Sequence, residues 1–306
     1  MAEMQPGRAR PPETRTDAAA LVGGVEGAGG AAEASSGAAE RDAGGGGAPP
    51  PATRPVPRVG RERWFHEHYV EAASEILAFL AEDGISLEGA DLADVGSGDG
   101  IIDLGVAHTA APGSLVGFDT DATDPATLLG IVREFGVADE LPSNLRFEQC
   151  SPRTLPAADA AFDVVFSWST FEHVQWPVAL CGEIRRVLRP GGVAMIQLWP
   201  FYHSEHGSHL WEWLPEGFDQ YLVPRDEARR RVLSAAPDLD WARYQLGTFL
   251  NRITLDDLQR ALLAGGLRPT KVQLLSEGFH VPPGLAHLPL SLLAISGVKL
   301  LAVPLA

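Results

Sequence analysis

The sequence predicts an α/β fold, a doubly wound and mostly parallel sheet of seven strands, from three observations. Apolar strand-like runs alternate with helical patterns, which is typical of a parallel sheet with right-handed crossovers. A glycine turn, DVGSGDG at residues 94–100, joins one strand-like run to a helical one. The next strand-like run ends in Asp119, where a carboxylate at the edge of such a sheet suits the hydroxyls of a ribose.

The individual elements follow from hydrophobic periodicity and from breaker residues. Strands are expected at 91–96, 114–119, 145–150, 162–168, 192–199, 271–277 and 291–300. Helices are expected from Trp64 to Gly84 and at 100–110, 124–135, 177–188 and 255–265, the last with Thr254 as its N-cap. The last two strands follow one another without a helix, so the final strand is predicted to be antiparallel.

The domain organisation is expected to be a tail followed by one domain. Residues 1–60 are rich in Gly, Ala and Pro and carry no periodic apolar pattern, so we expect a disordered tail. Residues 61–306 are expected to form the folded domain. Its segment from about 200 to 250 is too long for a simple connection after the fifth strand, which predicts an inserted lid over the ligand.

Composition excludes several classes of function. The formal charge of −16 argues against a nucleic-acid partner, which would need a basic face. The first residues lack an apolar signal core, and His287, Lys299 and two prolines interrupt the apolar C-terminal run, so neither a secretory signal nor a membrane span is expected. Cys150 and Cys181 form no CxxC pair and are expected to be buried thiols, consistent with the cytoplasm.

The glycine turn predicts a ligand site. Gly96, Gly98 and Gly100 allow positive φ and a close approach of the backbone, and the following helix begins with its positive end toward the ligand. Ile101 stands where a dinucleotide fingerprint has its third glycine. The spacing therefore disfavours a nicotinamide enzyme such as a nucleotide-sugar dehydrogenase.

Two further motifs lie downstream in a fixed order, FDVVFSWSTFEHV at 162–174 and RRVLRPGG at 185–192. Together with the glycine turn and Asp119, they resemble the class I S-adenosylmethionine-dependent methyltransferases of the small-molecule, type 11-like group. The resemblance covers the chain from about Trp64 onward. It implies a Rossmann-like methyltransferase fold and S-adenosylmethionine as cofactor.

The resemblance also implies which residues hold the cofactor. Asp94 and the three glycines would hold its amino-acid end, and Asp119 its ribose. Thr120 and Ser151 fall beside the adenine, where Pro152 lacks an N–H and the family usually has an acid in place of Ser151. Ser167 is expected to face the cleft. The full set of cofactor residues is Asp94, Gly96, Gly98, Gly100, Asp119, Thr120, Ser151 and Ser167.

Catalysis is expected in the loop after the fourth strand. Glu172 and His173 match the family's Glu-His pair, and an imidazole is the side chain best suited to accept a proton near neutral pH. His173 is the first candidate for the general base and His206 the second. The alternative is that the pair only orders the loop, since methyl transfer often needs positioning alone.

The histidines of the inserted segment raise the question of a metal. His203, His206 and His209, with the Glu-His pair, offer imidazole and carboxylate ligands. Their spacing matches no zinc signature and Gly207 interrupts them, so no metal is expected and they are interpreted as lid residues. Three tryptophans are interpreted as the lid's own core or as the wall of an acceptor pocket: Trp199, Trp211 and Trp213.

The expected function is methyl transfer from S-adenosylmethionine to a small polar acceptor, most simply a hydroxyl of a sugar or natural product. N- or C-methylation is the alternative reaction. A non-catalytic S-adenosylmethionine-binding regulatory protein is the alternative of another class. The expected partner is a small-molecule acceptor, with neither nucleic acid nor membrane.

Overall fold

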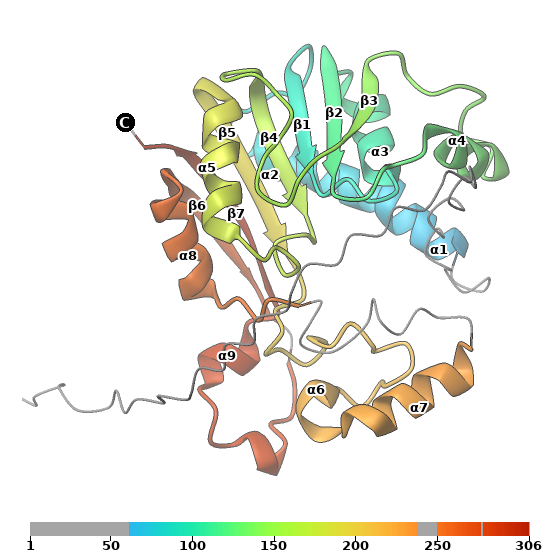
Figure 1. Cartoon of the computed structure of the whole chain (residues 1–306), viewed down its shortest axis with the longest axis vertical. Helices are drawn as coiled ribbons and strands as arrows, with labels where there is room; N and C mark the ends of the chain where they lie inside the picture. The colour runs from blue at the N-terminus through green and yellow to red at the C-terminus, as the bar shows by residue number, and fades with distance from the viewer. Residues whose placement is uncertain (1–60, 238–249, 277, 306) are drawn as a thin grey trace, which may run out of the picture. The chain divides into compact units, whose positions relative to one another are not determined.

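A seven-stranded sheet with helices on both faces forms the centre of the structure (Figure 1). The structure is a computed structural model, and it describes residues 61–237, 250–276 and 278–305. The strand order is β3-β2-β1-β4-β5-β7-β6. The predicted doubly wound sheet is confirmed, while the predicted tail at 1–60 lies outside the described residues.

The strands fall close to their predicted positions. They are β1 (Asp91–Val95), β2 (Ser114–Asp119), β3 (Leu145–Gln149), β4 (Phe162–Trp168), β5 (Leu188–Leu198), β6 (Leu267–Leu275) and β7 (Gly297–Pro304). The pairs among β1 to β5 are parallel, whereas β7 is antiparallel to both β5 and β6, as predicted. The carboxyl ends of the parallel strands therefore meet at one edge.

The alternation of side chains along the strands builds two cores. On β1, Ala93 and Val95 face α5 (Pro177–Val187) and α8 (Leu255–Ala264). Leu92 faces the opposite way, toward α2 (Ala73–Ala81) and α3 (Ile101–Ala110). In Figure 1, α5 lies in front of the sheet and α3 behind it. The central strands are apolar on both faces because both faces are covered.

The first helix and the helix caps also follow from the sequence. The helix expected from Trp64 forms as α1 (Arg61–His66), a π-helical turn η1 (Glu67–Ala72) and α2. Thr254 caps α8 in a capping box with Asp257, as its sequence predicts. Asp124 caps α4 (Pro125–Glu134), accepting the N–H groups of the next two residues after the proline.

Two strand boundaries and the burial of one cysteine differ from the prediction. β5 begins at Leu188, because that residue pairs with Phe162 before a register shift. The strand expected at 291–300 begins at Gly297, since Pro289 precedes a short helix, α9 (Leu290–Ala294). β3 is an edge strand, so Cys150 just beyond it is half-buried rather than buried.

The segment between β5 and α8, which we call the insertion, has local structure of its own. Its described part contains α6 (Asp219–Leu222) and α7 (Arg225–Ala235). Leu210, Leu214 and Val232 form a small apolar cluster, against which Trp213 packs. No described helix is long and apolar enough to cross a membrane. The apolar C-terminal run instead forms α9 and β7.

Candidate functional site

The glycine turn after β1 is held against the end of β2. Gly98 donates its N–H to Asp119 Oδ2 over 2.8 Å, and Asp121 donates its N–H to Asp119 Oδ1 over 2.9 Å. Gly96 donates to the carbonyl of Phe118 over 2.7 Å. The Asp119 carboxylate is thus fixed in orientation by backbone N–H groups at the carboxyl edge of the sheet.

The same turn touches the loop that follows β4. Gly96 has φ of +94°, and a Cβ added to it would lie 2.1 Å from the Thr170 hydroxyl oxygen. Thr170 lies two residues before Glu172 in the expected catalytic loop. Gly96 is therefore required both for its backbone conformation and for this close approach. The turn and the loop are brought together by packing that the linear sequence does not show.

A second buried acid lies beside Asp94. Asp103 of α3 is completely buried and Asp94 is 2% exposed, and the two acids lie close enough to affect one another electrostatically. Burial raises the pKa of Asp103 to about 8, and burial together with Asp103 raises the pKa of Asp94 well above its usual range. A carboxylate only accepts hydrogen bonds, so a hydrogen bond between two such groups requires a proton on one of them. The sequence analysis did not identify Asp103, whose only signal is an acid in an otherwise apolar helix.

This pair predicts a pH-dependent stability. The pKa of Asp103 is raised in the folded state, so its contribution is complete below about pH 4 and is lost as pH rises toward about 8. We expect the free energy of unfolding of the wild type to fall over that window. Asp103→Asn should reduce the fall, as measured by denaturant unfolding at pH 5 to 8. Asp121→Asn, an exposed control, should leave the slope unchanged, and equal slopes for Asp103→Asn and wild type would contradict the assignment.

Ser167 does not lie where the sequence analysis expected it. Its side chain is 2% exposed, and its hydroxyl donates to the carbonyl of Val95 over 2.7 Å. The prediction that Ser167 faces the cleft is wrong, because its side chain is buried against the backbone of β1. Its hydroxyl instead ties β4 to the end of β1, directly below the glycine turn.

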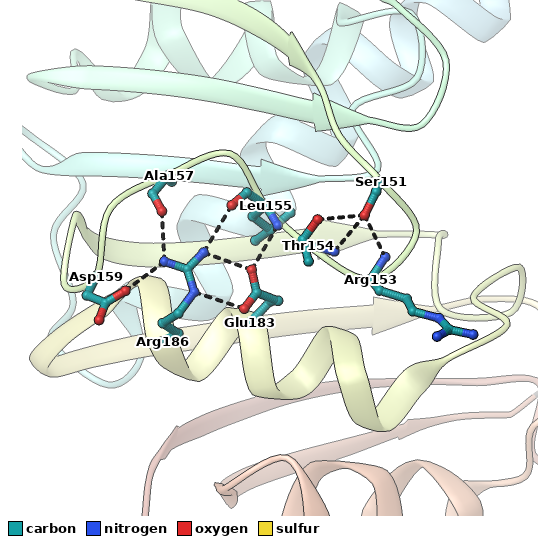
Figure 2. A network of polar contacts seen from close by, with 8 residues as sticks. All are labelled: Ser151, Arg153, Thr154, Leu155, Ala157, Asp159, Glu183 and Arg186. Atoms are coloured by element: carbon teal, nitrogen blue, oxygen red, sulfur yellow. Dashed lines mark hydrogen bonds and ion pairs between the residues drawn. The ribbon is translucent and has the colours of Figure 1, made fainter.

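The expected adenine side is a tight turn after β3. The Ser151 hydroxyl accepts the N–H of Thr154 over 3.0 Å and of Arg153 over 3.3 Å, and it shares a hydrogen bond with the Thr154 hydroxyl. Figure 2 shows these contacts around Ser151. Thr120 is exposed, and its carbonyl accepts the side-chain amide of Gln149 over 2.8 Å. Ser151 is thus a turn-forming residue in this structure.

A guanidinium on α5 fixes the loop that follows this turn (Figure 2). Arg186 donates to the carbonyls of Leu155 and Ala157 over 3.0 and 2.7 Å, and to Asp159 over 2.8 Å. It also forms a two-pronged pair with Glu183, whose carboxylate accepts the Leu155 N–H over 2.9 Å. Three bonds from this side chain hold the loop on α5, and two more pair it with Glu183 of the same helix.

We expect Arg186→Met to lower the free energy of unfolding by about 1–3 kcal/mol, the cost of leaving several partners unsatisfied at a partly exposed site. The measurement is denaturant unfolding. Arg185→Met is the matched control, because Arg185 is the exposed neighbour on the same helix. Equal losses for the two variants would show that the network contributes nothing specific.

The loop after β4 holds Glu172 and His173 in place. The side chain of Glu172 is 3% exposed and that of His173 is 22% exposed, with 3.8 Å between Glu172 Oε1 and His173 Nε2. Asn251, near the end of the insertion, donates its side-chain amide to the carbonyls of Phe171 and Val174 over 2.6 and 2.7 Å. Its backbone N–H donates to the Glu172 carbonyl over 2.8 Å. The sequence analysis did not single out Asn251, which clamps the loop from a distant part of the chain.

The three histidines of the insertion occupy different places. Nδ1 of His203 hydrogen-bonds to the hydroxyl of Tyr221. His206 is half-buried, with its ring 6.1 Å from the ring of Trp211. His209 lies against His173, with 5.2 Å between ring centroids. The structure therefore adds His209 to the expected Glu-His pair and separates His203 from it.

The residues at this edge fit S-adenosylmethionine. Backbone N–H groups line the turn, and the carboxylate of Asp119 stands beside them. Gly96 lets the backbone come close where any side chain would collide with Thr170. Asp94 Oδ1 is buried and makes no hydrogen bond to a described donor. A group carrying a ribose and an ammonium matches these acceptors.

Comparison with known proteins gives a consistent result. A family model described as a methyltransferase domain matches residues 93–196. An uncharacterized methyltransferase of Mycobacterium leprae is 31% identical over 198 residues, covering 57% of this chain and 67% of that protein. One of Mycolicibacterium vanbaalenii is 34% identical over 128 residues, covering 40% of this chain and 46% of that protein. This chain spans about half the length of the Mycolicibacterium vanbaalenii relative and of a similar one from Mycobacterium ulcerans.

Solved structures agree on the fold. A chain in the complex between the Haloferax volcanii Trm112 methyltransferase activator and its methyltransferase partner superposes with a TM-score of 0.50 at 17% identity. The superposition covers 81% of this chain and 95% of that chain. At this identity the likeness concerns the fold.

Proposed function

The chain belongs to the class I S-adenosylmethionine-dependent methyltransferases, and we propose that it transfers the methyl group of S-adenosylmethionine to a hydroxyl of a small polar acceptor. A sugar or a natural product is the proposed acceptor class. Bound S-adenosylmethionine supplies a methyl group made electrophilic by a positively charged sulfur. The chain's own residues must hold the acceptor in line, exclude water and take up the hydroxyl proton.

One observation carries this proposal most directly. The turn that would hold the cofactor and the loop that carries Glu172 and His173 are in contact through Gly96 and Thr170. The turn is hydrogen-bonded to Asp119, the proposed ribose acceptor, and the loop carries the His173 imidazole beside Glu172. Cofactor binding and proton uptake are thereby supported at the same edge of the sheet.

The proposed cofactor residues divide by chemistry. Asp119 would accept hydrogen bonds from the ribose hydroxyls, since each of its oxygens retains accepting capacity beyond one backbone N–H. Asp94, buried beside Asp103, would face the ammonium of the amino-acid end. Thr120 and the turn at Ser151 remain the proposed adenine side. Ser167 would support the turn indirectly, because its hydroxyl bonds to the carbonyl of Val95, the residue before Gly96.

Proton uptake is assigned to His173. Its side chain is partly exposed at the carboxyl edge, and the nearly buried Glu172 carboxylate faces its Nε2. A carboxylate beside an imidazole orients the ring and stabilises the imidazolium that forms on proton transfer. Glu172 is therefore proposed as the positioning partner, with His206 as the second candidate base.

Asp119→Ala is the test of the cofactor site. We expect it to weaken S-adenosylmethionine binding by about 1.5–3 kcal/mol, the range for hydrogen bonds to a charged group. The measurement is calorimetric titration, with Asp119→Asn as a variant that keeps one acceptor and should lose less. Unchanged affinity for Asp119→Ala, or tighter binding of a nicotinamide dinucleotide than of S-adenosylmethionine, would refute the assignment.

The reaction itself is tested by turnover with labelled S-adenosylmethionine on a panel of sugars, phenols and amines. Methylation of a hydroxyl is the expected result. Methylation only of amines would support the N-methyltransferase alternative. Cofactor binding without turnover on any acceptor, in the presence of an intact fold, would favour a regulatory protein.

A further inference from the structure

Three side chains with metal-binding chemistry converge at the edge just described. One ligand atom from each of Glu172, His173 and His209 lies within 4.8 Å of the other two. Glu172 and His173 follow β4, whereas His209 comes from the insertion, so the cluster exists only in the folded chain. Its acid is nearly buried and both imidazoles are half-buried. The carboxylate and the two imidazoles therefore form a compact and largely buried set of possible ligand atoms.

His209 is held in this position at a conformational cost. Its φ is +62°, a region that residues with a Cβ seldom adopt. Trp211 packs against its ring, with 5.8 Å between centroids. Gly207, two residues earlier, has no space for a Cβ, which would lie 2.0 Å from the Tyr202 carbonyl oxygen. Backbone strain of this kind is typical of functional sites, where surrounding contacts maintain it.

We propose that Glu172, His173 and His209 bind a divalent transition-metal ion, with Zn²⁺ as the natural occupant. Two imidazoles and one carboxylate form the ligand set of open zinc sites, which leave a further position for an exogenous oxygen. Ligands about 2.1 Å from such an ion lie roughly 3.4 Å apart. The 3.8 Å between Glu172 Oε1 and His173 Nε2 is close to that separation. Small side-chain rotations would therefore bring both atoms to coordination distance of one ion.

The spacing along the chain had argued against a metal, because no zinc signature is present. That argument concerned ligands on one helix, where spacing fixes geometry. Here the ligands come from two segments, and the spatial cluster replaces the sequence motif. Of the three histidines of the insertion, only His209 belongs to this described cluster, whereas His203 bonds to Tyr221.

The role of the ion rests on the proposed function, although its binding does not. An ion with an open position would hold the acceptor hydroxyl and lower the pKa of that hydroxyl. The hydroxyl proton would then pass to water or to His206, because the ion occupies the lone pair of His173. Without the ion, His173 itself accepts the proton. The same pair thus serves with or without the metal, at different rates.

The test is calorimetric titration of the metal-free full chain with Zn²⁺, and with Co²⁺ followed by its visible absorbance. We expect one equivalent to bind to the wild type. His209→Ala and Glu172→Gln should each weaken binding at least about 10-fold. His203→Ala, outside the cluster, is the matched control and should bind as the wild type does.

Two results would overturn the proposal: no stoichiometric Zn²⁺ binding to the wild type, or equal affinities for the wild type and His209→Ala. If His209→Ala does not fold, as judged by its melting curve, Glu172→Gln and His173→Ala decide. Titration of the same samples with S-adenosylmethionine measures cofactor affinity independently of metal binding. Zn²⁺ binding without S-adenosylmethionine binding would refute the proposed function and leave the metal site standing. A methylation rate insensitive to chelator would remove the ion's role in acceptor activation.

Discussion

Replacing His173 by alanine is expected to lower the single-turnover rate of hydroxyl methylation by ~10²–10⁴, the usual contribution of a general base. Affinity for S-adenosylmethionine should stay nearly unchanged, because His173 is not one of the proposed cofactor residues. The measurement is rapid-quench methylation with enzyme in excess. A loss confined to the rate would show that His173 acts on the acceptor rather than on the cofactor.

Two controls make this prediction specific. His203→Ala should retain the wild-type rate, since that ring is bonded to Tyr221. His206→Ala should lose less than His173→Ala, because its ring lies beside Trp211 and outside the cluster. Wild-type rates in both His173→Ala and His206→Ala would mean that the reaction proceeds by positioning alone, or that the acceptor is an already deprotonated nitrogen.

Gly96→Ala is expected to reduce S-adenosylmethionine affinity by ~100-fold or more, or to prevent folding. The new Cβ would sit at φ of +94° and 2.1 Å from Thr170 Oγ1, with the Thr170 Cβ at 2.7 Å. Positive φ at a residue with a Cβ costs roughly 1–2 kcal/mol, and forced overpacking typically adds 1–3 kcal/mol. The turn or the loop must move, and either movement separates the cofactor site from His173. Calorimetry and a thermal melt measure the two outcomes.

Two glycines with open surroundings serve as controls. Gly130→Ala in α4 meets nothing within 4 Å and has ordinary φ, so it should be neutral or slightly stabilising. A Cβ at Gly98 also meets nothing, but its φ is +57°. Gly98→Ala should therefore reduce affinity only by the cost of the positive φ. Combining Gly96→Ala with Thr170→Ala should recover part of the affinity. Wild-type affinity in Gly96→Ala would contradict the close-packing argument.

Most strands and helices of the sheet could be predicted because their signals are local. β2 and β4 fall on their predicted ranges, since an apolar run bounded by turn residues defines a strand buried on both faces. Thr254 caps α8 because an N-cap acts within its own helix turn. The predicted strand at 291–300 was partly wrong where a local apolar signal could not separate a short helix from a strand.

The candidate site was predictable only in part. Asp119 and the glycine turn were identified, because a strand, a turn and a helix in that order place them at one edge. Ser167 was expected to face the cleft, but its hydroxyl is buried against the Val95 carbonyl, a contact with a strand distant in sequence. Asp103 was missed because its meaning comes from its burial beside Asp94.

The sequence by itself determined the fold class, the family resemblance, and the positions of the cofactor turn and of the Glu-His pair. Each of these depends on residues near one another along the chain. Only the tertiary structure decided that Asn251 clamps the catalytic loop, that Gly96 packs on Thr170, and that His209 rather than His203 joins the pair. The physical reason is that these contacts join segments far apart in sequence, and their distances are set by the packing of the whole domain rather than by local backbone preferences.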